Sequence, residues 1–470
     1  MKVNESKYIS SNKNLFNQLL KELLNKYEYA SILVTDSVGT NYAVSKSGTS
    51  ISDNSLYSYR GYVIKAYKHG YFSEYSSDML TEELIPYILE TVEQSFVAYE
   101  GNSEDPYDSV DEESATFVYS SDYEIDPPAF GDDKVIAELT RIHEEGMKLD
   151  ERLVNVYVSV SYQKFSKLFL SPKKDMLQNI CWSNGFVISY AKRGDEVKEY
   201  YSPASMLGGF EIVDKLKDCL KISVKGAIEL LNSKPMIPGE YECICTPEVT
   251  GMIVHEAFGH GVEMDMFVKD RAKAREYIGE YVASKLVTMH DGNAVNQVAT
   301  YCFDDEGVRS KDTVVIDKGV LVGGFSDLQS AMRLKTAPTG NGRRQDYSRK
   351  AYARMTNTYF EPGTDDLEDM IKSISYGFML ENASSGMEDP KNWGIQCMVN
   401  VAREIKDGKF TGNIFSPIVL TGYVPDLLKS ISAVSKDFEL GGSGYCGKGY
   451  KEWVKVSDGG PYIKAKIRLG

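Results

Sequence analysis

The sequence predicts an α+β protein in which antiparallel sheets predominate, and three observations lead to that class. The 470 residues are too many for one typical core, so at least two domains are expected. Alternating apolar and polar residues predict strands along much of the chain, interrupted by a few segments with helical periodicity. The stretch "KPMIPGEY" (234–241) is rich in proline and glycine. We therefore expect an α/β N-terminal domain over 1–234 and a β-rich C-terminal domain over 235–470.

The N-terminal domain begins with a predicted helix, because apolar residues recur at helical spacing in "NLFNQLLKELLNKY" (14–27). The next stretch, "YASILVTDSVGTNYAVSK" (29–46), predicts two short strands about a turn at residues 37–39. A hairpin that turns at His69-Gly70 is predicted by "GYVIKAYKHGYFSEY" (61–75). Thr81, followed by acidic residues, predicts the start of another helix.

Residues 102–126 are acidic and rich in turn formers, which predicts an exposed linker between two sub-regions of the N-terminal domain. The periodicity of the following segments predicts an amphipathic helix, two long strands, a second helix and, past the boundary, a strand that leads into a helix. In order, the first five segments are 133–150, 152–170, 184–194, 206–234 and 241–245, and the helix that follows carries His255 and His260. The rest of the chain predicts strands joined by glycine-rich turns.

Composition and charge exclude some classes of function. The net charge of −15 and a pI near 5.0 argue against a nucleic-acid partner, because phosphate binding needs a basic surface. No stretch approaches the ~18 apolar residues of a membrane helix, and the first residues lack the apolar run of a signal peptide. With seven cysteines in no framework spacing, we expect a cytoplasmic protein with reduced thiols. Cys243 and Cys245 alternate on one predicted strand face, where core packing is expected.

The stretch "GMIVHEAFGHGVEMD" (251–265) is the strongest candidate for chemistry. His255 and Glu256 look like the start of the H-E-x-x-H helix of zinc proteases, but His260 follows at i+5 instead of i+4. On a regular helix this spacing turns the two imidazoles about 140° apart. Gly259 tolerates a widened turn, and an i→i+5 bulge would return both histidines to one face. The spacing therefore predicts a distorted helix if the histidines share an ion, and two unrelated histidines otherwise.

A catalytic zinc site usually needs a third protein ligand. The stretch "GGSGYCGKGY" (441–450) offers Cys446 between glycines, with Lys448 near enough to favour the thiolate. A thiolate and two imidazoles suit zinc, which accepts soft and borderline ligands. The alternative for Cys446 is a buried, unreactive thiol. The weaker candidates for a third ligand lie in a predicted hairpin turn, on an exposed helix face and in a loop: His69, His143 and His290.

With these residues in view, the segment "TPEVTGMIVHEAFGHGVEMD" (246–265) resembles the active-site helix of the TldD family of zinc-dependent peptidases, in the TldD/PmbA superfamily. TldD-type subunits keep H-E-x-x-x-H and the late cysteine, whereas PmbA-type subunits, also called TldE, lose them. This chain keeps both, so it resembles the catalytic type. Further stretches resemble family blocks in the family's order: "DDEGVRSKDTVVIDKGVLVGGFSD" (304–327), "PTGNGRRQDY" (338–347), "ARMTNTYFEPG" (353–363), "GGSGYCGKGY" (441–450) and "VSDGGPYI" (456–463).

The resemblance implies that His255, His260 and Cys446 ligate zinc and that Glu256 activates water. It also implies an α/β N-terminal region followed by a β-rich catalytic domain that carries the zinc-binding helix. Family members form dimers around an internal cavity and act on unfolded proteins and peptides. We therefore expect a metallopeptidase that works as a homodimer or as a heterodimer with a PmbA/TldE-type subunit, with no nucleic-acid or membrane partner.

Simple chemistry gives the neighbouring side chains further roles. Glu256 adjoins His255, so its carboxylate can take a proton from water and pass it to the leaving amine. Glu263 and Asp265 are expected either to orient the histidines through hydrogen bonds or to form ordinary salt bridges. Four side chains are expected either to hold peptide carbonyls or a terminal carboxylate, or to form structural ion pairs: Arg343, Arg344, Arg354 and Asn357.

Two functions other than a zinc peptidase stay open. One is a cysteine hydrolase with Cys446 as nucleophile and a histidine as base, and chelators would distinguish it from a zinc peptidase. The other is a non-catalytic partner subunit whose metal is structural, which would need a fourth protein ligand. Phosphate binding by "GNGRR" or "GKGYK" is disfavoured, because neither has the spacing of a phosphate-binding loop.

Overall fold

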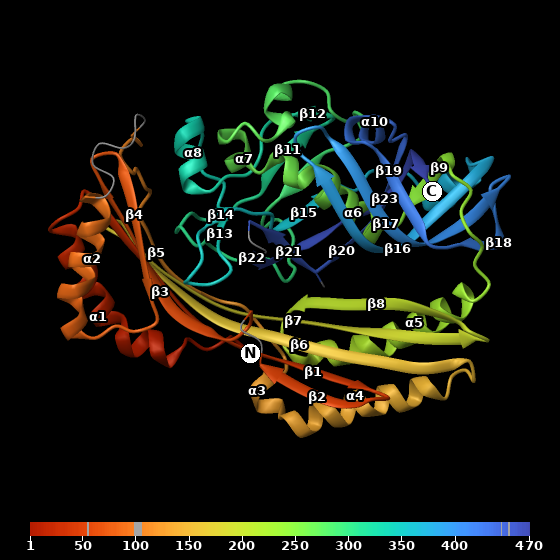
Figure 1. Cartoon of the computed structure of the whole chain (residues 1–470), viewed down its shortest axis with the longest axis horizontal. Helices are drawn as coiled ribbons and strands as arrows, with labels where there is room; N and C mark the ends of the chain where they lie inside the picture. The colour runs from red at the N-terminus through yellow and green to blue at the C-terminus, as the bar shows by residue number, and fades with distance from the viewer. Residues whose placement is uncertain (54–55, 98–105, 443, 450–451) are drawn as a thin grey trace.

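The computed structural model describes residues 1–53, 56–97, 106–442, 444–449 and 452–470. Figure 1 shows two β-rich halves stacked on each other, the N-terminal half in red to yellow-green below the C-terminal half in green to blue. The class is α+β with mainly antiparallel sheets, as the sequence predicts. No helix within these described ranges is long and apolar enough to cross a membrane.

The N-terminal half contains an eight-stranded sheet in the order β4-β3-β1-β6-β7-β5, with β2 added to β1 and β8 to β7. Its pairs are antiparallel apart from the parallel pair β5–β7. The strands are β1 (Tyr29–Ser45), β2 (Gly48–Asp53), β3 (Tyr59–Lys68), β4 (Tyr71–Ser77), β5 (Ala115–Ser120), β6 (Leu153–Leu170), β7 (Lys174–Arg193) and β8 (Glu196–Leu207). The helices are α1 (Lys7–Leu24), η1 (Glu82–Leu84), α2 (Ile85–Val97), α3 (Pro127–Phe130), α4 (Asp132–Met147), η2 (Phe210–Lys215) and α5 (Leu216–Leu230).

The first strand differs from the prediction of two short strands about a turn. β1 is continuous, and it pairs with β6 without a break from Ile32 to Val44. Gly39, which suggested a turn, marks a close approach, because an added Cβ would collide with the carbonyl oxygen of Tyr162. The hairpin predicted at His69-Gly70 is confirmed, and it joins β3 to β4.

The acidic segment 102–126 is more than a linker. Residues 102–105 lie outside the described residues, but β5 forms within the segment and pairs with β7 from Ala115 to Ser120. Glu112, just before β5, accepts a hydrogen bond from the Ser171 hydroxyl at 2.6 Å. Sheet pairing of this kind depends on distant partners, which local composition does not reveal. The division into two domains stays a prediction.

Helices cover one face of the N-terminal sheet, and the C-terminal half covers the other. Ile32 of β1 is buried in one cluster with Phe16 of α1. The next residue, Leu33, points to the opposite face and packs with Phe169 and Phe303. Since Phe303 belongs to the C-terminal half, the two halves share an apolar contact.

Buried ion pairs also connect the halves. Lys65 pairs with Glu306, and Lys167 pairs with Asp305, with both acids at most 4% exposed. A buried charge is strongly unfavourable without a partner. These pairs therefore fix the position of the 304–306 segment against the N-terminal sheet.

The C-terminal half contains an eleven-stranded sheet and two small two-stranded sheets, β13–β14 and β21–β22. Cys243 and Cys245 of β9 are fully buried, which confirms their predicted place in the core. The strands are β9 (Gly239–Cys245), β10 (Met289–Asp291), β11 (Thr313–Asp317), β12 (Val320–Leu321), β13 (Gly342–Arg343), β14 (Tyr352–Ala353), β15 (Asn357–Phe360), β16 (Tyr376–Asp389), β17 (Gly394–Lys406), β18 (Lys409–Phe415), β19 (Ile418–Tyr423), β20 (Ala433–Gly441), β21 (Tyr445–Lys448), β22 (Glu452–Lys455) and β23 (Ser457–Leu469). The helices are α6 (Pro247–Met252), η3 (Ile253–Gly259), η4 (His260–Val262), α7 (Met264–Val268), η5 (Lys273–Tyr277), α8 (Leu328–Leu334), α9 (Leu367–Lys372) and α10 (Val424–Lys429).

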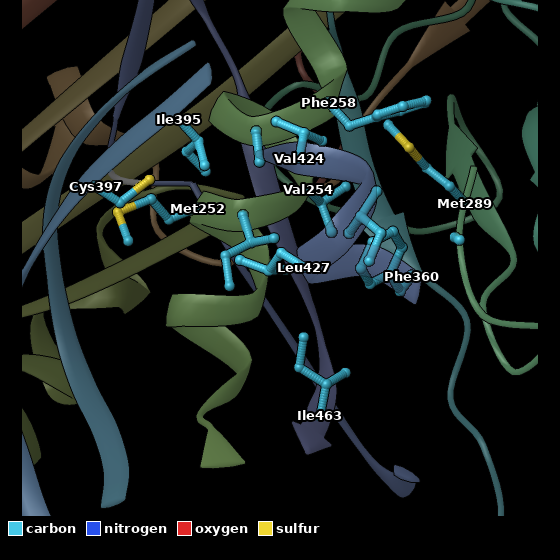
Figure 2. Packing of buried hydrophobic residues seen from close by; sticks show 14 of the residues in the cluster. Met252, Val254, Phe258, Met289, Phe360, Ile395, Cys397, Val424, Leu427 and Ile463 are labelled. Carbon is cyan, nitrogen blue, oxygen red and sulfur yellow. The ribbon is translucent and has the colours of Figure 1, made fainter. Parts of the chain in front are cut away.

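The helical run from α6 to η4 crosses the core of the C-terminal half. Val254 and Phe258 are fully buried in the main apolar cluster. Figure 2 shows both among Phe360 of β15 and Val424 and Leu427 of α10. Because apolar contacts surround this helix, the polar side chains it carries are held at fixed positions.

Candidate metal centre

The histidine-bearing helix widens where the two histidines stand five residues apart. η3, which follows α6, is a π-helix. A π-helix bonds residue i to residue i+5, so these residues lie on one face. The imidazole centroids of His255 and His260 are accordingly 5.2 Å apart. Gly259 suits this turn, because an added Cβ would collide with the sulfur of Met355. The widened turn predicted from the spacing is confirmed.

Cys446 reaches these histidines from β21, 186 residues beyond His260. Its Sγ lies 3.5 Å from Nε2 of His260. Three possible ligand atoms, one from each of His255, His260 and Cys446, lie within 4.8 Å of one another. Among the residues that the structure describes, no other cluster of three histidine, cysteine or acidic side chains is this compact.

The cluster is closed on one side and accessible on the other. The side chain of His255 and the residue Cys446 are each 4% exposed. The side chains of His260 and Glu256 are 21% and 27% exposed. A ligand or water can therefore approach from the side of His260 and Glu256.

The charges of the cluster are strongly coupled. Burial alone would raise the pKa of the Cys446 thiol, but the adjacent His260 and His255 hold this pKa well below its usual range. Burial alone would lower the pKa of His260, yet Cys446 and Glu263 raise it well above its ordinary value. Without a metal, the favoured state is a thiolate beside protonated imidazole, and a bound cation would take the place of the protons.

Glu256 lies next to the cluster but outside the three-ligand group. Its Oε2 is 4.0 Å from Nε2 of His260, the nitrogen that also faces Cys446. Burial raises the pKa of the Glu256 carboxyl, while His255 and His260 oppose that shift. A carboxylate at this position can accept a proton from a molecule that enters the accessible side of the site.

Glu263 and Asp265 form the charged layer behind His260. Glu263 Oε2 lies 3.3 Å from Nδ1 of His260 and accepts a hydrogen bond from Lys448 Nζ at 2.9 Å. Burial opposes ionisation of Glu263, but Lys448 and His260 lower its pKa to about 2. The partners of Asp265 are lysines and not a histidine. It accepts a hydrogen bond from Lys448 at 2.6 Å and pairs with Lys269 at 3.1 Å. Lys448, expected beside the thiol, is thus directed to these two carboxylates.

Two acids that the sequence analysis did not single out also face the histidines. Asp458 Oδ2 is 3.9 Å from Nδ1 of His255, an otherwise unpartnered buried nitrogen. Burial raises the pKa of Asp458 to about 6, although His255 opposes the shift. Glu388 Oε2 accepts a hydrogen bond from the backbone N–H of Gly261 at 3.0 Å. Asp458 could have been found from the sequence, because it stands in a glycine-rich stretch like that of Cys446. No local sequence feature identifies Glu388.

The predicted substrate contacts are engaged within the protein. Arg343 donates to the carbonyl oxygens of Met355 and Lys455 at 2.5 and 2.6 Å. Arg354, 1% exposed, donates to the carbonyl oxygen of Cys446 at 2.6 Å. Fully buried Asn357 donates to Gly292 and Thr300. In addition, Arg344 donates to the carbonyl oxygen of Arg349 at 2.7 Å and pairs with Glu74 at 3.3 Å. These contacts give the four side chains structural partners, and their role in substrate binding stays a prediction.

The three other histidines lie apart from this cluster. Nδ1 of His143 is 2.6 Å from the carbonyl oxygen of Val156, and His69 faces Glu28 from an exposed position. His290 lies between two carboxylates, with Nδ1 2.6 Å from Asp312 and Nε2 2.8 Å from Glu361. Its ring stacks on Tyr359.

We expect His290 to make stability depend on pH. Burial alone would lower the pKa of His290, but Asp312 and Glu361 raise it above the ordinary value near 6.5. The folded pKa therefore exceeds the unfolded pKa. The stabilisation is fully present below about pH 6.5 and is lost as the pH rises through the raised folded pKa.

Denaturant midpoints measured across this pH range check the expectation. The loss of stability with rising pH should be smaller in His290→Gln than in the parent. His69→Gln, which changes an exposed histidine, should follow the parent curve. Equal pH dependence in the parent and His290→Gln would contradict the assignment.

The residues present fit a zinc ion. Two imidazoles and a thiolate within 4.8 Å are a typical borderline-to-soft donor set for zinc. Several acids surround this set, and His255 Nδ1 and Glu263 Oε1 are buried without hydrogen-bond partners. A divalent cation would offset the negative charge that these acids concentrate at the site.

The C-terminal half of the chain is similar to known metallopeptidases. Residues 238–468 match the family model described as the PmbA/TldA metallopeptidase C-terminal domain. A metalloprotease of Methanothermobacter thermautotrophicus is 30% identical over 60% of this chain and 62% of its own length, so less than two thirds of that relative is covered. The zinc metalloprotease TldD homolog of Saccharolobus solfataricus is 26% identical over 72% of this chain and 74% of its own.

A solved structure extends the likeness in fold to nearly the whole chain. TldE from Thermococcus kodakarensis superposes with a TM-score of 0.75 over 96% of this chain and 99% of that chain, at 18% identity. The fold similarity therefore includes the N-terminal half, where the family model does not match. The C-terminal half of the chain, over residues 238–468, therefore carries the PmbA/TldA metallopeptidase C-terminal domain.

Proposed function

We propose that this chain is a zinc-dependent peptidase in which His255, His260 and Cys446 hold the metal and Glu256 acts as general base. The convergence of these ligands, with a carboxylate 4.0 Å from a ligand nitrogen, is the observation that carries the proposal. Zinc in such a site polarises a peptide carbonyl and makes water more acidic. The names of the relatives as metalloproteases support the same reaction class.

The chain's own residues would then have separate roles in the reaction. Glu256 accepts the proton of the attacking water and delivers it to the leaving nitrogen. Glu263 fixes the orientation of His260 by accepting a hydrogen bond from Nδ1. On the other ligand, Asp458 lies on the Nδ1 side of His255 and favours the tautomer that presents Nε2.

Substrate, assembly and location form the finer part of the proposal. Unfolded polypeptides or peptides are the proposed substrates, cleaved in a cavity enclosed by a dimer in the cytoplasm. The proposed partner is a second copy or a PmbA/TldE-type subunit. The accessible side of the site, next to Glu256, is where an extended chain would enter.

One alternative is favoured by a specific observation. The 3.5 Å contact between Cys446 Sγ and His260 Nε2, together with the lowered thiol pKa, also describes the nucleophile and base of a cysteine hydrolase. The two functions differ in their response to metal removal, because a cysteine hydrolase needs no metal.

The test uses the purified chain and its metal content. We expect about one zinc per chain, hydrolysis of a denatured protein, little hydrolysis of the same protein when folded, and loss of activity on chelation that added zinc restores. A metal-free chain whose activity resists chelators would overturn the zinc proposal. Equal cleavage of folded and denatured protein would overturn the substrate class.

A further inference from the structure

The third proposed ligand stands on a hairpin that is separate from the main sheet. β21 and β22 pair with each other as a two-stranded sheet, whereas His255 and His260 stand on the core helix. The eleven-stranded sheet therefore does not by itself fix Cys446 beside the histidines. Other contacts must hold this hairpin against the helix.

Two cationic side chains, Lys448 and Arg354, make such contacts. Cys446 and Lys448 lie two residues apart on β21, so their side chains share one face. Lys448 Nζ donates to Glu263 at 2.9 Å and to Asp265 at 2.6 Å, both just beyond His260. Arg354 donates to the carbonyl oxygens of Cys446 and Glu452, so it holds both strands of the hairpin.

Glu263 is where these contacts converge. Its Oε2 faces both Nδ1 of His260 and Nζ of Lys448. Its Oε1 lies 4.0 Å from Nε of Arg354. The side chains of Glu263, Asp265 and Lys448 are 2%, 8% and 12% exposed, so little water is available to replace a lost partner.

We propose that Lys448, with Arg354, is a positioning residue that docks the Cys446 hairpin onto Glu263 and so completes the metal centre. This inference rests on the proposed function, because it takes Cys446 as the third zinc ligand. Without Lys448, Glu263 would keep only His260 and Arg354 as partners among the described residues, and Asp265 would keep only Lys269. Repulsion of the thiolate by these two carboxylates and the lost hydrogen bonds would favour a position of Cys446 farther from His260.

The chain offers a matched control for this role. Lys269 also pairs with Asp265, at 3.1 Å, but it follows α7 on the helical side, and the described residues show no hydrogen bond or ion pair from it to β21 or β22. Lys448→Met and Lys269→Met each remove one lysine partner of the same carboxylate. Only the first removes hydrogen bonds between the hairpin and the helical segment.

Zinc affinity and a cobalt spectrum test the proposal in the full chain. Loss of an outer-shell partner typically weakens metal binding by about 10–100-fold, and we expect this weakening in Lys448→Met but not in Lys269→Met. In cobalt-substituted protein, the thiolate-to-metal charge-transfer band should decrease in Lys448→Met and should recover in part in Lys448→Arg. Equal zinc affinity and equal cobalt spectra in the two methionine variants would overturn the inference.

A second variant decides the matter if Lys448→Met does not fold. Asp265→Asn leaves His260 and Cys446 in place but weakens the 2.6 Å contact to Lys448. A several-fold loss of zinc affinity would support the proposal, and unchanged affinity would overturn it. Failure of the proposed function is distinguishable, because the parent chain itself would then bind no zinc.

Discussion

Replacing Glu256 by glutamine is expected to lower kcat/KM for peptide hydrolysis by about 10²- to 10⁴-fold while zinc remains bound. Glutamine keeps the shape of the side chain but cannot accept a proton at neutral pH. Glu256 is outside the group of three ligand atoms, so metal affinity should change little. The measurement pairs steady-state kinetics on an unfolded substrate with elemental analysis of zinc.

Two comparisons make the Glu256 experiment specific. Glu276→Gln, which changes an exposed glutamate of the same half, should keep parental activity. A variant that loses zinc together with activity would show that Glu256 helps to hold the metal. Retained activity in zinc-loaded Glu256→Gln would rule out the general-base role.

Replacing Cys446 by alanine is expected to remove most bound zinc and with it the peptidase activity. The thiolate is one of only three protein ligands in the proposed site, so the loss of affinity should exceed the ~10–100-fold typical of an outer-shell partner. Competition with a chromophoric chelator measures the affinity. Cys302→Ala, at a partly exposed cysteine outside the site, serves as the control.

Chelation of the parent separates the zinc peptidase from the cysteine hydrolase, because Cys446→Ala is inactive in both cases. In the zinc peptidase, chelation of the parent abolishes activity, and Cys446→Ala is inactive because it lacks metal. In the cysteine hydrolase, the chelated parent stays active and alkylation of Cys446 inactivates it. Activity in chelated parent protein would therefore reject the zinc mechanism.

Local patterns in the sequence were sufficient for much of the fold and for the histidine helix. Apolar periodicity located α1 and α4, and the turn residues located the hairpin at His69-Gly70. The spacing of His255 and His260 predicted a widened helix, since only such a turn brings residues five apart to one face. These features depend on residues a few positions apart, so a single sequence contains the information.

The same local patterns gave wrong predictions where a strand pairs with a partner far away in the sequence. The turn formers at residues 37–39 suggested a break, but pairing with β6 keeps β1 continuous. Acidic composition suggested a linker over 102–126, but β7 recruits part of it as β5. In both places, hydrogen bonds to a partner more than fifty residues away outweigh the local preference.

The sequence alone determined which residue types are candidate ligands and how the two histidines are spaced, and tertiary structure decided their surroundings. Cys446 was a candidate by its glycine-rich setting, but its distance to His260 depends on how the β21 hairpin docks. Arg354 and Lys448 are cations in the sequence, and only the fold shows that Arg354 contacts the hairpin backbone and that Lys448 contacts Glu263. The physical reason is that a charge does not specify its partner. The partner of a buried charge is set by which distant segments the apolar core brings within hydrogen-bond distance.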